Sequence, residues 1–269
     1  MSASDPYTII LAPNPSLMTG PGTNTIVLGG GVEGATVIDP AVDDSEYLTA
    51  LIEAGKERGG LRRILITHGH SDHMDGAAAL REKLNISIYA FSRAGVSIAD
   101  EELADGAIIP AGDDTLRAIH TPGHRFDHLC FLLEKERVLF AGDLLAGTGT
   151  VVIIPPEGDM LDYLASLRRL QTLDLASIVP AHGPVITDPQ AKLTEYIDHR
   201  LEREQQILTI LHANSFGINI PVIVQQIYAD VDPALHAMAA RSVEAHLIKL
   251  EREGRVRREN TVYVMVEPA

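Results

Sequence analysis

The chain of 269 residues has a single cysteine, Cys130, no tryptophan, and an aromatic content of only 4%. One thiol cannot form an intrachain disulfide, which suits a reducing compartment. Because aromatic side chains are few, the core has to be built from Ile, Leu, Val and Ala. The hydrophobic content of 45% supplies enough of these residues for a full core.

Positive charge is also scarce, because 22 Lys and Arg stand against 37 Asp and Glu, which gives a formal net charge of −15. A field of that sign repels polyanions and disfavours a general nucleic-acid binder. No basic residue precedes Lys56, so the sequence shows neither a secretory signal nor a transit peptide. No apolar run reaches the length of a membrane span. We expect a cytoplasmic protein with no membrane partner; no obligate protein partner is evident, and the oligomeric state stays open.

Strand-like and helical segments alternate along the first two thirds of the chain. Apolar runs bounded by glycine-rich or polar turns predict strands, and a 3.6-residue periodicity predicts helices. The predicted strands are 25–28, 35–38, 64–67, 86–90, several between 107 and 141, and 177–179; the predicted helices are 45–58, 75–84 and 161–173. This order indicates an α+β fold in which sheets lie between layers of helices.

The chain changes character after about residue 190. A long amphipathic helix over 190–212 is followed by helices at 221–228 and 233–253, and residues 255–266 alternate like a two-stranded hairpin. Three helices followed by such a wing describe a winged-helix module. We therefore predict two domains, 1–189 and 190–269.

The most informative segment follows the apolar run 64–66. Residues 67–76 read Thr-His-Gly-His-Ser-Asp-His-Met-Asp-Gly, so His68, His70, Asp72 and His73 fall within six positions. Imidazole nitrogen and carboxylate oxygen are ligands that zinc and similar divalent ions prefer. Without a cation, so many titratable groups in one small volume would be costly. The cluster therefore predicts a metal site at the end of a strand.

Three more candidate ligands each follow a strand-like run. His124 ends Ile-His-Thr-Pro-Gly-His, Asp143 ends Val-Leu-Phe-Ala-Gly-Asp, and His182 stands within Ile-Val-Pro-Ala-His-Gly-Pro. Loops at strand ends are where sheet proteins place reactive groups, and the adjacent glycines permit the chain to approach an ion closely. Together with the first cluster, these donors are enough for two metal ions.

The ordered set His-x-His-x-Asp-His, followed by a distant His, Asp and His, resembles the metallo-β-lactamase superfamily. The resemblance extends over nearly the whole chain to the beta-lactamase-like protein 2 group, through the segments 22–25, 180–184 and 199–207 and the winged-helix tail. It implies an αββα sandwich with a small C-terminal winged-helix module. The chain departs from the group at two positions that are often aromatic there, which are Ile26 and Gly69.

The resemblance also implies a role for each candidate ligand. It places a first metal ion on His68, His70 and His124, a second on Asp72, His73 and His182, and Asp143 between the two. In such a zinc-dependent hydrolase, a hydroxide that bridges the two metals is the nucleophile. Asp72 orients that hydroxide and is the expected catalytic residue. Zinc is the expected metal, and manganese and iron are the alternatives, because the same donors accept them.

The resembling group contains a single-strand-specific endoribonuclease and fungal enzymes that hydrolyse polyketide thioesters. We therefore expect an ester-type bond in the substrate, either in a small-molecule thioester or in single-stranded RNA. Two alternatives stay open: a β-lactam hydrolase, and a winged-helix nucleic-acid binder with a vestigial metal domain. The second would use Arg252, Arg255, Arg257 and Arg258 in salt-dependent binding. A metal-dependent oxidoreductase ranks last, because no flavin-type sequence accompanies the ligands.

The residues around these ligands give less specific signals. Asp127 and His128 either contact substrate or support the neighbouring ligands, and Thr67 and Asp75 are candidates for outer contacts to the imidazoles. The loop 147–158, which contains two successive prolines, either faces the substrate or is only a connector.

Overall fold

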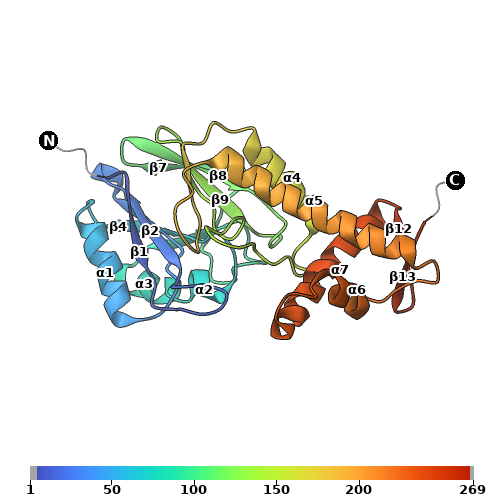
Figure 1. Ribbon diagram of the computed structural model, residues 1–269. Helices are drawn as coiled ribbons and strands as arrows, with labels where there is room; N and C mark the ends of the chain where they lie inside the picture. Colours follow the sequence, from blue (N-terminus) through green and yellow to red (C-terminus); the bar gives the residue numbers. More distant parts are fainter. Residues whose placement is uncertain (1–4, 267–269) are drawn as a thin grey trace. The chain divides into compact units, whose positions relative to one another are not determined.

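The computed structural model describes residues 5–266 (Figure 1). The described residues form two compact units: the first consists of residues 5–121, 127–151 and 171–190, and the second of residues 122–126, 152–170 and 191–266. The predicted domain boundary after residue 189 stays a prediction. None of the helices within residues 5–266 is long and apolar enough to cross a bilayer.

Two β-sheets form the framework of the first unit. The six-stranded sheet has the order β1-β2-β3-β4-β5-β6 and the five-stranded sheet the order β11-β10-β9-β8-β7. The strands are β1 (Tyr7–Leu11), β2 (Asn24–Gly29), β3 (Ala35–Ile38), β4 (Leu61–Leu65), β5 (Ser87–Ala90), β6 (Glu101–Glu102), β7 (Ile108–Ala111), β8 (Asp114–His120), β9 (Leu129–Leu133), β10 (Val138–Phe140) and β11 (Ser177–Val179). Every strand predicted from the sequence is present, although β4 ends at Leu65.

Alternate side chains of the six-stranded sheet face two different cores. In β2, Ile26 and Leu28 belong to the core shared with the five-stranded sheet, whereas Val27 belongs to the core that holds α1 (Ser45–Lys56) and α3 (Ala77–Leu84). Ile64 and Leu65 of β4 divide in the same way. Because successive residues of a strand point to opposite faces, this division buries both faces of the sheet.

The strand pairing also decides where reactive residues gather. β3 and β4 pair in parallel, and so do β10 and β11. The carboxyl ends of parallel neighbours lie at the same edge of a sheet, so the segments that follow these strands emerge together. These segments contain the predicted ligands of the 68–73 cluster, Asp143 and His182. Within the cluster, Ser71–Met74 form the short helix α2.

The second unit contains the predicted C-terminal helices and hairpin. Its elements are most of α4 (Met160–Gln171), most of α5 (Pro189–Ala213), α6 (Ile220–Ile227), α7 (His236–Arg252), β12 (Val256–Glu259) and β13 (Val262–Met265). Ile207 and Leu211 of α5, Ile223 of α6, Leu247 of α7 and Tyr263 of β13 belong to one apolar core. Figure 1 shows these last elements in orange and red, packed beside the C-terminal part of α5.

A buried carboxylate ties α5 to α7 and to the segment after it. Glu204 is 5% exposed; its Oε2 lies 2.7 Å from Lys249 Nζ, and its Oε1 lies 2.9 Å from Arg255 Nη1. Burial raises the pKa of Glu204, but the nearby His246 and Lys249 outweigh burial and hold the pKa at about 2. The carboxylate therefore remains charged in the folded protein far below its usual pH range.

We predict that Glu204→Gln lowers the free energy of unfolding at pH 7 by about 2–3 kcal/mol. The difference between the folded pKa of about 2 and the ordinary value of 4.5 corresponds to at most about 3 kcal/mol. Because the folded pKa is depressed, this contribution is complete above about pH 4.5 and is lost as the pH falls toward 2. Urea denaturation of both proteins measures it, with the exposed Glu202→Gln on the same helix as control. Equal losses in the two variants would contradict the prediction.

Candidate metal centre

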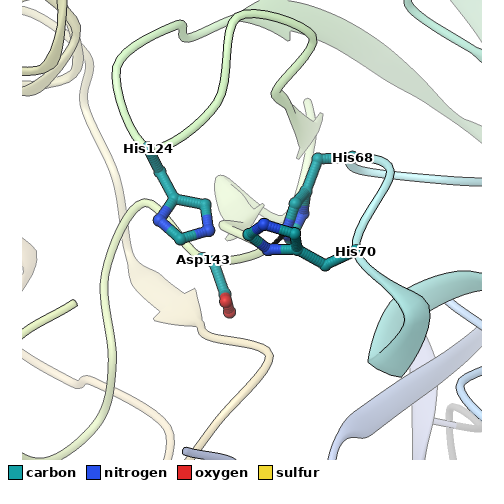
Figure 2. A group of neighbouring side chains, drawn as sticks. All are labelled: His68, His70, His124 and Asp143. Carbon is teal, nitrogen blue, oxygen red and sulfur yellow. Dashed lines mark hydrogen bonds between the residues drawn. The ribbon is translucent and has the colours of Figure 1, made fainter. Parts of the chain in front are cut away.

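Four predicted ligands lie together in the structure. The potential ligand atoms of His68, His70, His124 and Asp143 all lie within 4.8 Å of one another. In Figure 2 the ring of His124 faces those of His68 and His70, and the carboxylate of Asp143 lies beside them. The Nε2 atom of His68 is 2.8 Å from the Nδ1 atom of His70, so both nitrogens face a common point.

The other three predicted ligands form a second group. The potential ligand atoms of Asp72, His73 and His182 also lie within 4.8 Å of one another. Asp143 Oδ1 lies 3.5 Å from His73 Nε2 and 3.2 Å from His182 Nε2. Asp143 therefore lies against both groups, which is the position that a shared ligand needs.

Four of these imidazoles have their Nδ1 atom next to a group that fixes the ring. The partners are Asp39 Oδ2 for His73 (2.7 Å), Thr67 Oγ1 for His68 (3.1 Å), the Val152 carbonyl for His124 (3.0 Å) and the Gly22 carbonyl for His182 (3.5 Å). An imidazole held at Nδ1 offers the lone pair of Nε2 to the other side of the ring. Neutral rings that are held in this way are suited to bind a metal through Nε2.

The buried ring of His73 tests whether a cation fits here. Its Nδ1 atom bonds to Asp39, but its buried Nε2 atom has no hydrogen-bond partner among residues 5–266. That nitrogen lies 3.5 Å from a carboxylate oxygen of Asp143 and 3.9 Å from one of Asp72. A lone pair facing two carboxylates is unfavourable unless a positive charge lies between them. A divalent cation bound by these atoms would supply that charge, so the donors fit a metal.

The pKa shifts of three ligands also show that their surroundings favour positive charge. Burial lowers the pKa of His73, but the carboxylates of Asp143 and Asp39 outweigh it and raise the pKa well above its ordinary value. Burial likewise lowers the pKa of His182, and the hydrogen bond to Asp72 with the charge of Asp143 reverses that effect. Burial raises the pKa of Asp72, but His182 and His73 bring it below its usual range.

Asp39 supports the site, and the sequence interpretation did not include it. The residue is only 2% exposed, and its φ of 52° is unusual for a residue other than glycine. Besides His73, it accepts hydrogen bonds from the amide of Thr67 at 2.8 Å and from the Thr67 hydroxyl at 2.7 Å. The signal was available, because Asp39 directly follows a buried strand. The predicted outer contact of Thr67 is confirmed by its contact with His68.

Asp127 and His128 hold neighbouring backbone segments and are both buried. Asp127 Oδ2 accepts a hydrogen bond from the Gly69 amide at 3.0 Å. His128 Nε2 accepts one from the amide of Asp143 at 3.1 Å, while its Nδ1 atom lies 2.9 Å from a threonine hydroxyl. Of the two roles predicted for these residues, the structure shows support of the segments that contain ligands.

The glycine before Asp143 allows a close approach of the chain. Gly142 has a φ of 50°, and a Cβ atom there would lie 2.6 Å from His128 Nε2. A larger residue would be strained and would displace the His128 ring. The expectation that glycine beside this ligand permits unusual backbone angles is therefore confirmed.

Comparison with protein families agrees with this geometry. Residues 18–182 match the model of the metallo-beta-lactamase superfamily, and residues 220–262 match the beta-lactamase associated winged helix domain. The chain therefore belongs to the metallo-beta-lactamase superfamily, whose members are generally hydrolases. The predicted αββα fold class and the C-terminal winged helix are confirmed by these matches.

Individual relatives show which part of the superfamily this chain resembles. The chain is 36% identical to a beta-lactamase-like protein 2 homolog from Caenorhabditis elegans, over 93% of this chain and 86% of that protein. It is 33% identical to an atrochrysone carboxyl ACP thioesterase from Aspergillus chevalieri, over 82% of this chain and 73% of that protein. A metallo-beta-lactamase family protein from Thermus thermophilus shares the fold, with a TM-score of 0.79, 22% identity, and coverage of 97% and 99%. The predicted resemblance to the beta-lactamase-like protein 2 group is confirmed.

We predict that Asp39→Asn weakens the binding of a divalent metal by about 10- to 100-fold, because the His73 ring loses its charged partner. Competition with a chromogenic chelator measures the affinity of the metal-free protein for Zn²⁺. Asp43→Asn is the matched control, since Asp43 is an exposed aspartate four residues further along the chain. An unchanged affinity in Asp39→Asn would show that this carboxylate does not orient a ligand.

Proposed function

We propose that this protein is a hydrolase that depends on two divalent metal ions, in the first place zinc. The observation that supports the proposal is that imidazole nitrogens and two carboxylates from several strand ends gather in two groups, with Asp143 close to both. His68, His70 and His124 would hold one ion, Asp72, His73 and His182 the other, and Asp143 both. Two such ions, when bound, lower the pKa of a water molecule and polarise a carbonyl or phosphoryl oxygen. Manganese and iron are compatible with the same donors.

Asp72 is the carboxylate that we assign to proton handling. Its side chain is 29% exposed, compared with 14% for Asp143 and 3% for Asp39. Its Oδ2 atom lies 3.4 Å from His182 Nε2, so one oxygen faces the ligands while part of the group stays accessible. In this position Asp72 is able to orient an attacking water, take its proton and pass the proton to the leaving group.

The substrate that we favour is an acyl thioester. One relative, 33% identical to this chain, is named as an acyl carrier protein thioesterase. The net charge of −15 opposes the approach of RNA, which is itself a polyanion. The same machinery attacks phosphodiesters and strained amides, so single-stranded RNA and β-lactams are the competing substrates in the test.

The contacts of four arginines in the winged helix also favour a thioester over RNA as the substrate. Each of the four that would contact nucleic acid has a partner within the chain: Arg252 pairs with Asp159, Arg255 with Glu204 and Glu253, and Arg257 with Glu259, while Arg258 donates to the Asn260 carbonyl. Nearby carboxylates cancel much of the local positive field that a phosphate backbone requires. This pairing disfavours the alternative of a nucleic-acid binder with a vestigial metal domain.

A hydrolysis panel with elemental analysis of the same sample tests the proposal. We expect turnover of an acyl thioester that exceeds turnover of single-stranded RNA and of a chromogenic cephalosporin, with about two equivalents of divalent metal bound. Chelation should abolish turnover, and added Zn²⁺ should restore it. A protein that holds no metal, or that cleaves none of the three substrates, would refute the proposal.

We further predict that His70→Ala and Asp143→Ala each reduce turnover by at least about 1,000-fold, because the ligand set is then incomplete. Circular dichroism should show that both variants stay folded. His212→Ala, at an exposed position of α5, is the matched histidine control and should keep wild-type turnover. Wild-type-like turnover by either ligand variant would rule out the two-metal centre.

A further inference from the structure

His124 is held by a different part of the chain from the one that holds the other candidate ligands. Its segment, residues 122–126, belongs to the second compact unit, together with the loop 152–159, α4 and α7. The His124 Nδ1 atom donates to the Val152 carbonyl at 3.0 Å, and this bond sets the direction of Nε2. The position of Val152 therefore controls how His124 presents its ligand atom.

The loop 152–159 is packed directly on the backbone of the His124 segment. The Asp159 amide donates to the Gly123 carbonyl at 2.8 Å, and the Gly158 amide closes the loop on the Ile154 carbonyl at 2.8 Å. A Cβ atom at Gly158 would lie 2.8 Å from the His124 carbonyl oxygen. Since the two segments are in such close contact, a shift of the loop would be transmitted to His124.

Two arginines of α7 hold this loop from the winged-helix side. Arg241 Nη2 donates to the Pro155 carbonyl at 3.0 Å. Arg252, the last residue of α7, forms an ion pair through Nη1 with Asp159 Oδ2. The other oxygen of Asp159 accepts from the amides of Leu161 and Asp162 at 2.9 and 3.1 Å, at the start of α4. Asp159 thus joins α7, α4 and the His124 segment.

We propose that Arg241 and Arg252 are positioning residues for the metal ligand His124. They fix the loop 152–159, and the loop fixes the ring of His124 through the Val152 carbonyl. On this view the winged-helix module supports a metal ligand, and the loop that contains the two prolines is more than a connector. The inference rests on the proposed metal-binding function, but it concerns metal affinity and coordination and not the identity of the substrate.

Exposed ion pairs add little to overall stability, and the side chains of Arg241 and Arg252 are 47% and 57% exposed. A purely structural role therefore predicts no change in metal binding when these arginines are replaced. A positioning role predicts a selective loss of metal affinity, because the ring of His124 is then less ordered. The two roles differ in a property that does not depend on turnover.

The experiment compares Co²⁺ binding by metal-free wild type, the double variant Arg241→Gln/Arg252→Gln, and Arg257→Gln as matched control. Arg257 lies in the wing and pairs with Glu259. We expect the double variant to bind Co²⁺ about tenfold more weakly and with an altered visible spectrum, with its melting temperature close to that of wild type. With lysine in place of glutamine at position 252, the variant Arg241→Gln/Arg252→Lys should regain part of the lost Co²⁺ affinity, because the lysine keeps a positive charge opposite Asp159.

Repeating the measurement in a protein that lacks the His124 ring makes the test specific to this ligand. In His124→Ala, the two arginine substitutions should cause no further loss of affinity, because their effect passes through the missing ring. Wild-type affinity and spectrum in the double variant would overturn the inference, and so would an equal loss in the His124→Ala background. If wild type itself bound no Co²⁺ or Zn²⁺, the proposed metal function would fail, and that result is distinct from unchanged binding among the variants.

Discussion

The constraint on which the rest of the site depends is the orientation of imidazole rings around closely spaced carboxylates. Carboxylate oxygens of Asp143 and Asp72 lie 3.5 and 3.9 Å from the buried Nε2 atom of His73, an arrangement that requires positive charge. A ring presents one nitrogen to a metal more reliably when its other nitrogen is held elsewhere, and for four of the five rings the chain supplies a carboxylate, a hydroxyl or a backbone carbonyl for that purpose. The outer contacts therefore decide whether the ligand atoms converge.

These outer contacts come from segments far apart in the sequence. Asp39 follows β3 and reaches both Thr67 and His73, so the two parallel strands β3 and β4 have to be in register. His128 holds the amide of Asp143 from the loop that precedes β9. Within the second unit, the loop 152–159 contacts α4, α7 and the segment that contains His124. The winged helix of this chain thus has a proposed role that does not involve nucleic acid.

Most of the fold followed from local patterns in the sequence. Glycine-bounded apolar runs predicted β2 and β3, and amphipathic periodicity predicted α5 to within one residue at each end. All seven candidate ligands came from motifs at strand ends, and the structure places them in two groups. Asp39 was not predicted, because it lies outside the histidine-containing motifs that marked the seven candidate ligands. The contact of Arg252 with the loop 152–159 was not foreseen either, since its partner Asp159 lies far away in the sequence.

The sequence by itself determined which residues are able to bind a metal, because ligand chemistry and the spacing around His68 are local properties. It also determined the order of most strands and helices, since hydrophobic periodicity records which face of each element is buried, but β1 and β6 were not predicted. Only the tertiary structure decided which nitrogen of each imidazole faces the site and which groups hold the other one. Those contacts, such as His73 with Asp39 and His124 with Val152, join residues that are 34 and 28 positions apart. They depend on strand register and loop packing, and no local pattern specifies either of these.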